Sequence, residues 1–120
     1  MTRFARAGAA SVAALSVAFS AQAADVKLGS DAGGLVFEPA TITIKAGETV
    51  NWVNNRGFPH NIVFDEDDVP GGVNPEALSN EDLMNAAGDK HSAKFTVAGE
   101  YGYYCEPHQG AGMVGRVIVN

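Results

Sequence analysis

The segment at residues 103–115, YYCEPHQGAGMVG, gathers three side chains that bind soft metal ions. Cys105 is the only cysteine of the chain, His108 follows it after two intervening residues, and Met113 follows His108 after four. The glycines between them allow backbone angles that other residues disfavour, so the segment can form a tight loop. Such a loop would turn the thiolate, the imidazole and the thioether toward one point.

This set of donors is typical of copper. Two histidines and a cysteine in a plane, with a weakly bound methionine above it, form a copper site that transfers electrons. The second histidine must come from another part of the chain, which holds only His60 and His91 besides His108. We predict His60 as the ligand because it lies between a turn and an apolar strand. His91 lies in the polar stretch GDKHSAK, and we expect it to be a solvated surface residue.

Other sites and structural roles fit these residues less well. Taken singly, a lone cysteine is commonly a small buried hydrophobe and a methionine beside a strand commonly fills the core. Their combined spacing in a glycine-rich loop argues against coincidence. Structural zinc is disfavoured because it usually takes four cysteine or histidine ligands. A cysteine hydrolase would need Cys105 with His60 as its base and Asn61 as an orienting group, but the sequence indicates neither a substrate cleft nor an oxyanion helix.

Short segments that alternate between apolar and polar residues predict the elements that must position the motif. Strands are expected at residues 26–30, 35–39, 41–45, 49–54, 60–64, 92–97, 100–105 and 113–120. Strands this short and closely spaced predict an all-β fold, a two-sheet Greek-key β-sandwich of about eight strands. Residues 65–90 break the pattern, and Ser79 with Asp82 resembles a capping box that predicts one short helical turn.

The first 23 residues have the features of a targeting signal. Arg3 and Arg6 precede an apolar, alanine-rich run, and Ala21-Gln22-Ala23 resembles a cleavage site of small residues. We therefore predict a removed signal at 1–23 and a single domain at 24–120. The mature chain would hold 14 acidic and six basic residues, a formal charge of −8. Such a charge repels nucleic acid and anionic membranes and attracts basic partners.

Two longer segments carry a family resemblance. GFPHNIVFDEDDVPGGV at residues 57–73 and YYCEPHQGAGMVGRVIVN at residues 103–120 resemble the plastocyanin family of small blue copper proteins. The resemblance covers roughly residues 24–120 and implies a cupredoxin-like sandwich with the copper ligands His60, Cys105, His108 and Met113. It implies a soluble, monomeric one-electron carrier that cycles between Cu(I) and Cu(II) and is not an enzyme. Its donor would be cytochrome f of the cytochrome b6f complex and its acceptor photosystem I, in the thylakoid lumen, peripheral to the membrane, with a chloroplast favoured over a cyanobacterium.

Further positions take their roles from the resemblance. Asn61 matches the asparagine that ties the two ligand loops together, and Tyr104 matches the surface tyrosine beside the ligand cysteine. Leu35 and Pro59 match members of an apolar patch around the exposed edge of His108. A basic partner is expected to dock at two acidic groups, which are Asp65, Glu66, Asp67 and Asp68 in the first and Glu81 and Asp82 in the second. Glu106 departs from the family, because many members carry serine there.

Two other functions are compatible with the motif. A different blue copper carrier would serve another donor and acceptor. A copper storage or delivery protein would favour several methionines or paired cysteines, whereas Met1 and Met84 lie away from the motif. An intense blue colour that bleaches reversibly on reduction separates a carrier from a delivery protein.

Overall fold

The computed structural model describes residues 23–120. They form nine strands, one short α-helix and one 3₁₀-helix. The predicted signal falls on residues 1–23, of which 1–22 lie outside the described part, so that division of the chain stays a prediction. In the described part, no helix combines the length and the apolar character that crossing a membrane requires.

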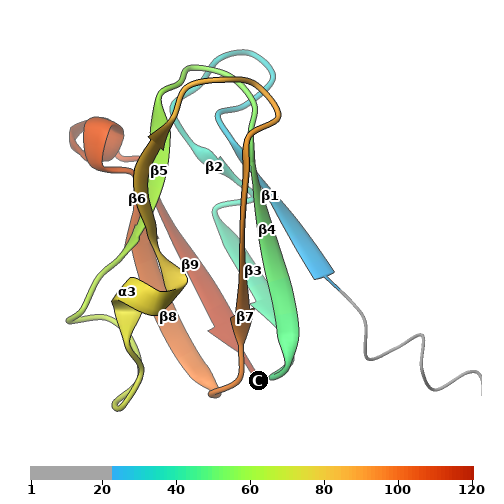
Figure 1. Ribbon diagram of the computed structural model, residues 1–120, viewed down its shortest axis with the longest axis vertical. Coiled ribbons are helices and arrows are strands. Elements are labelled where there is room, and N and C mark those ends of the chain that lie inside the picture. Colours follow the sequence, from blue (N-terminus) through green and yellow to red (C-terminus); the bar gives the residue numbers. More distant parts are fainter. Residues whose placement is uncertain (1–22) are drawn as a thin grey trace, which may run out of the picture.

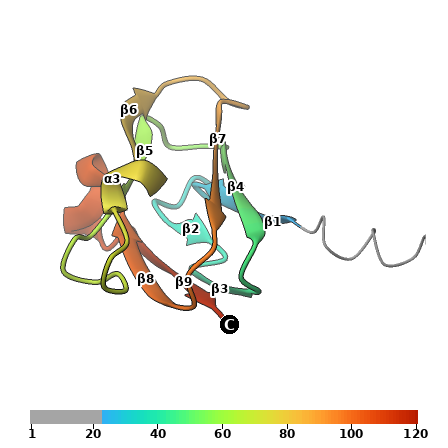
Figure 2. The same cartoon turned by 60° about the horizontal axis from the view of Figure 1, so that its bottom comes forward.

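The strands form two sheets that pack face to face, as Figure 1 and the turned view in Figure 2 show. The first sheet has the order β2-β1-β4-β7 and contains β1 (Ala23–Leu28), β2 (Phe37–Glu38), β4 (Glu48–Asn54) and β7 (Lys90–Phe95). The second has the order β3-β9-β8-β5-β6 and contains β3 (Thr41–Ile44), β5 (His60–Phe64), β6 (Asn80–Met84), β8 (Gly99–Tyr104) and β9 (Val114–Val119).

Both sheets are mixed. Strands β1 and β4 run parallel, as do β3 and β9, while the other paired strands are antiparallel. The prediction of an all-β sandwich is confirmed. The described strands number nine rather than about eight, because residues 80–84, which sequence reasoning left irregular, add β6 to the edge of the second sheet beside β5.

The core lies between the sheets and follows from period-two alternation. Along β4, Val50, Trp52 and Asn54 are buried while their neighbours are partly exposed, as expected for a strand with one face toward the core. Trp52 occupies the centre, with its ring centroid 5.5 Å from that of Tyr103 and 5.9 Å from that of Phe64. Edge-to-face contacts of this kind stabilise the packing of the two sheets beyond the burial of area.

The predicted helical turn at Ser79 and Asp82 is wrong in its position. The helix α3 (Pro75–Leu78) lies one turn earlier, and the side chain of Asn74 caps it by accepting a hydrogen bond from the Glu76 amide. Ser79 ends the helix instead: its hydroxyl donates to the Pro75 carbonyl and accepts from the amide of Phe64 on β5. Asparagine followed by proline is itself a signal for the start of a helix. The helix therefore begins after Asn74, and Ser79 lies at its end.

The prediction for His91 is also wrong. His91 is half-buried, and its ring stacks on Trp52 with centroids 5.6 Å apart. Its Nε2–H donates to the Leu78 carbonyl at 2.7 Å. This histidine therefore joins β7 to the helix α3 across the edge of the sandwich and has a structural role rather than a solvated one.

Candidate metal centre

Two segments at one end of the second sheet supply the candidate donors: the start of β5 and the connection from β8 to β9. His60 opens β5, Cys105 follows β8 directly, and Met113 directly precedes β9. His108 lies in the 3₁₀-helix η2 (Glu106–Ala111) between Cys105 and Met113. Because β8 lies between β5 and β9 in the sheet, residues that are 45 positions apart in the chain meet at one point.

The nitrogen and sulfur atoms of three donors converge. The Sγ atom of Cys105 lies 3.7 Å from Nδ1 of His60 and 3.6 Å from Nδ1 of His108. The ligand atoms of all three residues lie within 4.8 Å of one another. An ion bonded to nitrogen at about 2.0 Å and to sulfur at about 2.3 Å, with a nitrogen–metal–sulfur angle of about 115°, would hold these atoms at the observed sulfur–nitrogen distances. The separations therefore fit a single shared ion.

A backbone carbonyl fixes the tautomer of His60. Its Nε2 lies 2.6 Å from the carbonyl oxygen of Arg56, and since a carbonyl only accepts, the proton is on Nε2. The lone pair of Nδ1 is then free and faces Cys105. A hydrogen bond from the second ring nitrogen orients metal-binding histidines in this way. Burial, as the largest effect, lowers the pKa of His60 and favours the neutral imidazole that binds metal.

Cys105 and Met113 are both fully buried, so the site excludes water on the side of the sheets. Burial raises the pKa of the Cys105 thiol, and a thiolate at this position needs a nearby cation, which a bound metal supplies. The backbone closes the loop around them, because the Cys105 amide donates to the Met113 carbonyl and the Met113 amide to the His108 carbonyl. Gly112 makes this closure possible with a φ of 89°, an angle that residues with a Cβ rarely adopt.

Asn61 lies between the two segments that hold the donors and forms hydrogen bonds to both sides. Its Oδ1 accepts from the Glu106 amide at 2.8 Å, and its Nδ2 donates to the Glu106 carboxylate at 2.9 Å and to the Glu81 carbonyl at 3.1 Å. The Glu106 side chain thus turns toward Asn61 and adds a second hydrogen bond between β5 and η2. Serine at this position has no carboxylate to accept the second hydrogen bond.

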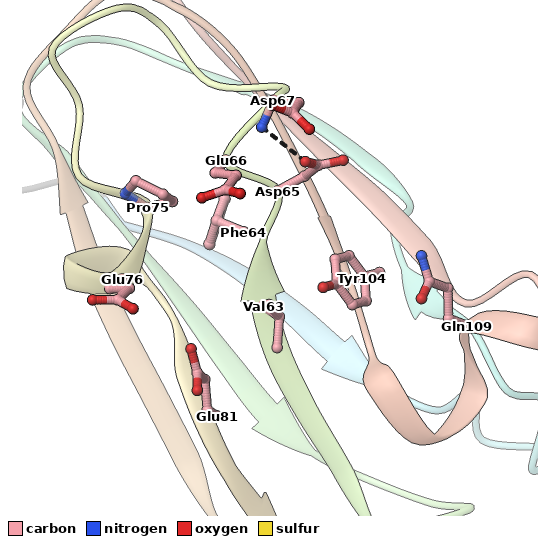
Figure 3. Close-up of a pocket in the computed structure, with 10 residues that line it drawn as sticks. All are labelled: Val63, Phe64, Asp65, Glu66, Asp67, Pro75, Glu76, Glu81, Tyr104 and Gln109. Atoms are coloured by element: carbon pink, nitrogen blue, oxygen red, sulfur yellow. Dashed lines mark hydrogen bonds between the residues drawn. The ribbon is translucent and has the colours of Figure 1, made fainter.

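The acidic side chains form a groove next to Tyr104. It has a volume of about 340 Å³ and is lined by Val63, Phe64, Asp65, Glu66, Asp67, Pro75, Glu76, Glu81, Tyr104 and Gln109. Figure 3 shows Glu66, Glu76, Glu81 and the ring of Tyr104 disposed around the same space. Glu76 was missed by sequence reasoning because it lies outside the acidic run. The cap at Asn74, which places Glu76 in the first turn of α3, was the signal that would have found it.

Two of the predicted docking carboxylates lie apart from this groove. Asp68 forms an ion pair with Arg116, at 2.7 Å between Oδ2 and Nη2, and packs against Gly102 of β8. Its charge is compensated within the chain, so it is less available to a basic partner than the other carboxylates of the run. Asp82 is exposed on β6 and does not line the groove.

The apolar residues of the predicted patch lie at the metal end of the fold. Leu35 and Pro59 are half-buried, and Gly57 packs so closely against Leu35 that a Cβ on it would lie 3.0 Å from Leu35 Cδ2. Phe58, which was not predicted, is 42% exposed. An exposed aromatic next to the candidate donors extends the apolar surface, and its signal in the sequence was its position between Gly57 and Pro59.

The chain resembles copper proteins over its whole described length. Residues 24–120 match the family of copper binding proteins of the plastocyanin/azurin type. The chain belongs to this family. It is 66% identical over 119 residues to a chloroplastic plastocyanin of Tetradesmus obliquus, covering 99% of this chain and 82% of the relative. It is 63% identical over 118 residues to that of Chlamydomonas reinhardtii, covering 98% of this chain and 81% of the relative.

Solved structures agree with the family assignment. A mutant plastocyanin of a fern superimposes with a TM-score of 0.70 at 36% identity, covering 81% of this chain and all of that one. Membership of the plastocyanin/azurin family confirms the predicted blue copper electron carrier and the predicted cofactor, copper.

Proposed function

We propose that His60, Cys105, His108 and Met113 hold one copper ion and that the chain is a soluble one-electron shuttle of photosynthesis. The observation that carries the ligand assignment is the convergence of Cys105 Sγ on the Nδ1 atoms of His60 and His108. The bound copper supplies the redox couple Cu(I)/Cu(II), with a thiolate and two imidazoles as its strong ligands. The protein transfers electrons and makes or breaks no bond of a substrate.

The chain's own residues keep this site the same in both oxidation states. His60 is oriented by the Arg56 carbonyl, and Cys105 and His108 belong to one loop closed by backbone hydrogen bonds. Asn61 holds that loop to β5. Because the ligands are fixed by the fold, they need not move when the charge on the ion changes. His108 is the one partly exposed member of the converging triad, so its ring offers the shortest route to a partner.

The proposed partners are cytochrome f as electron donor and photosystem I as acceptor, in the thylakoid lumen of a chloroplast. The similarity to the chloroplastic plastocyanins of Tetradesmus obliquus and Chlamydomonas reinhardtii supports this placement. The acidic groove next to Tyr104 supports a donor with a basic surface, since five carboxylates line it. Attraction of this kind raises the encounter rate without creating an interface that releases slowly.

The copper assignment is tested by loading the mature protein with Cu(II) and recording visible and electron spin resonance spectra. We expect an intense blue band that bleaches on reduction and returns on oxidation. A colourless Cu(II) protein, or a blue band that survives replacement of Cys105 by serine, would contradict the proposed ligand set.

The docking assignment is tested with a matched pair of variants that change the net charge equally. Glu66→Gln combined with Glu76→Gln neutralises the groove, while Asp25→Asn combined with Glu38→Gln neutralises two exposed carboxylates outside it. Stopped-flow transfer from cytochrome f should slow at low salt for the groove variant alone. The difference should shrink as the salt concentration rises toward 0.15 M, where the screening length is about 8 Å. Equal slowing of both variants would mean that only net charge matters.

A further inference from the structure

The hydrogen bond that orients His60 depends on a carbonyl group outside the regular elements. Nε2 of His60 lies 2.6 Å from the Arg56 carbonyl oxygen, and Arg56 lies in the connection between β4, which ends at Asn54, and β5, which begins at His60. Connections of this kind are commonly more mobile than the strands they join. The candidate ligand therefore keeps its orientation only if another segment holds this connection in place.

The segment at the end of β1 holds the connection through its backbone. The Leu28 carbonyl accepts hydrogen bonds from the amides of both Asn55 and Arg56, at 3.0 and 3.2 Å. The next residue of this segment, Gly29, is itself anchored, because its amide donates to the Val36 carbonyl at 2.8 Å. The backbone that carries the acceptor is thus tied to a segment 26 residues earlier in the chain.

Gly29 leaves the space that the Arg56 carbonyl occupies. It is buried, and its φ of 88° lies in the region that favours glycine. A Cβ at this position would overlap the Arg56 carbonyl oxygen and lie 2.8 Å from the carbonyl carbon. Because that oxygen is the acceptor for His60, relief of the overlap would move the acceptor away from Nε2. A side chain at residue 29 therefore acts on the ligand without being a ligand itself.

The side chain of Asn55 adds two hydrogen bonds to the same segment. Its Nδ2 donates to the Gly29 carbonyl at 2.9 Å and to Oδ1 of Asp31 at 3.0 Å, so both of its amide hydrogens are used. Removing this side chain would loosen the connection without creating an overlap. Gly29→Ala and Asn55→Ala therefore disturb the acceptor in two independent ways.

We propose that Gly29 and Asn55 are positioning residues for the copper ligand His60, on which they act through the Arg56 carbonyl. This rests on the ligand set of the proposed function. The carbonyl keeps the proton on Nε2 and the lone pair of Nδ1 toward Cys105. An acceptor that is out of place leaves the ring free to turn and lets the proton move to Nδ1, where it blocks the metal. Groups that orient a metal ligand in this way contribute about tenfold to 100-fold in metal affinity.

The first test observes the ring proton of His60 by NMR in the metal-free, nitrogen-15-labelled protein. In the wild type we expect this proton on Nε2 alone. In Gly29→Ala and in Asn55→Ala it should exchange with water about fivefold faster, the factor to which one hydrogen bond of about 1 kcal/mol corresponds. A fraction of the tautomer with the proton on Nδ1 should also appear.

Two control variants separate positioning from loss of stability. Gly99→Ala also places a Cβ at a positive φ, 143°, and in an overlap, 2.6 Å from Pro70 Cγ, but at the start of β8. Asn51→Ala removes an asparagine side chain that donates to Asp25 and lies on β4. Gly99→Ala should lower the melting temperature, and in both controls the His60 proton should behave as in the wild type.

The copper-loaded proteins give the second measurement. Gly29→Ala and Asn55→Ala should bind copper about tenfold more weakly than the wild type and shift the blue band, whereas the two controls should do neither. If the wild type forms no blue site, the proposed ligand set is wrong, and the metal-free measurement still decides whether the two residues position His60. Should Gly29→Ala fail to fold, Asn55→Ala decides alone. The proposal is overturned if a folded variant of either residue keeps the wild-type proton exchange and copper affinity, or if the controls change as much.

Discussion

Replacing Asn61 by leucine tests the link between the two ligand-bearing segments. The change keeps a similar volume and removes three hydrogen bonds, two to Glu106 and one to the Glu81 carbonyl. Bonds between neutral groups contribute about 1 kcal/mol each and bonds to a charged group about 1.5–3 kcal/mol, so the three sum to about 4 kcal/mol. Glu106 is exposed and regains water in the variant, which reduces the expected loss to about 2–3 kcal/mol.

Asn54→Leu is the matched control. Asn54 is as deeply buried as Asn61, and its side chain donates to the carbonyls of Met84 and Ala86. Two neutral bonds predict a loss of about 2 kcal/mol or less in the free energy of unfolding. Asn54 bridges β4 to the last residue of β6 and to the loop after it, and it makes no hydrogen bond to a candidate donor or to the Cys105–Met113 loop.

Denaturant unfolding of the copper-free variants measures the loss in the free energy of unfolding. The rate at which copper passes to an external chelator measures how tightly the site holds the ion. Asn61→Leu should release copper about tenfold faster than the wild type, which corresponds to about 1.4 kcal/mol, and should shift the blue band. Asn54→Leu should lose stability without either effect. If both variants release copper at the wild-type rate, Asn61 only supports the fold and our account of the link is wrong.

Three other substitutions have defined outcomes. Cys105→Ser should abolish the blue band while far-ultraviolet circular dichroism stays unchanged, because serine supplies a hard oxygen and the core needs no metal. Gly29→Ala should lower the melting temperature far more than Gly33→Ala, since both glycines have positive φ but only the first meets the Arg56 carbonyl. Burial raises the pKa of Tyr103 to about 12, against about 10 when unfolded. As the pH rises from 10 to 12, Tyr103 therefore loses its proton in the unfolded state before it does in the folded state. The free energy of unfolding then falls by about 1.4 kcal/mol per pH unit. Tyr103→Phe should remove this contribution from alkaline denaturation curves.

Local patterns in the sequence predicted the strands well and drew attention to the motif. The segment at residues 60–64 has the predicted bounds, because alternation and the preceding turn are both local signals. The Cys105–Met113 loop could also be recognised as a candidate metal-binding segment, since three of the four candidate donors lie within nine residues. Assigning His60 needed only a choice between two histidines.

The errors arose where a distant partner decides the environment. His91 has polar neighbours in sequence, but it lies directly opposite Trp52 in the pairing of β7 with β4, and only the strand register reveals that. Asp68 belongs to an acidic run, but its partner Arg116 is 48 residues away. Such contacts depend on topology, which composition and periodicity do not encode.

The place of the last strand in the second sheet determines when this protein can fold. Strand β9 pairs with β3 on one side and β8 on the other, so the sheet has a gap until residues 114–119 are available. The ligand loop lies immediately before that strand, and it closes only when β9 is in place. Chains that depend on such distant pairings fold slowly, on a scale of about milliseconds to seconds. The four candidate ligands therefore come together only after β9 has paired with both neighbours, so copper meets its complete set of ligands late in folding.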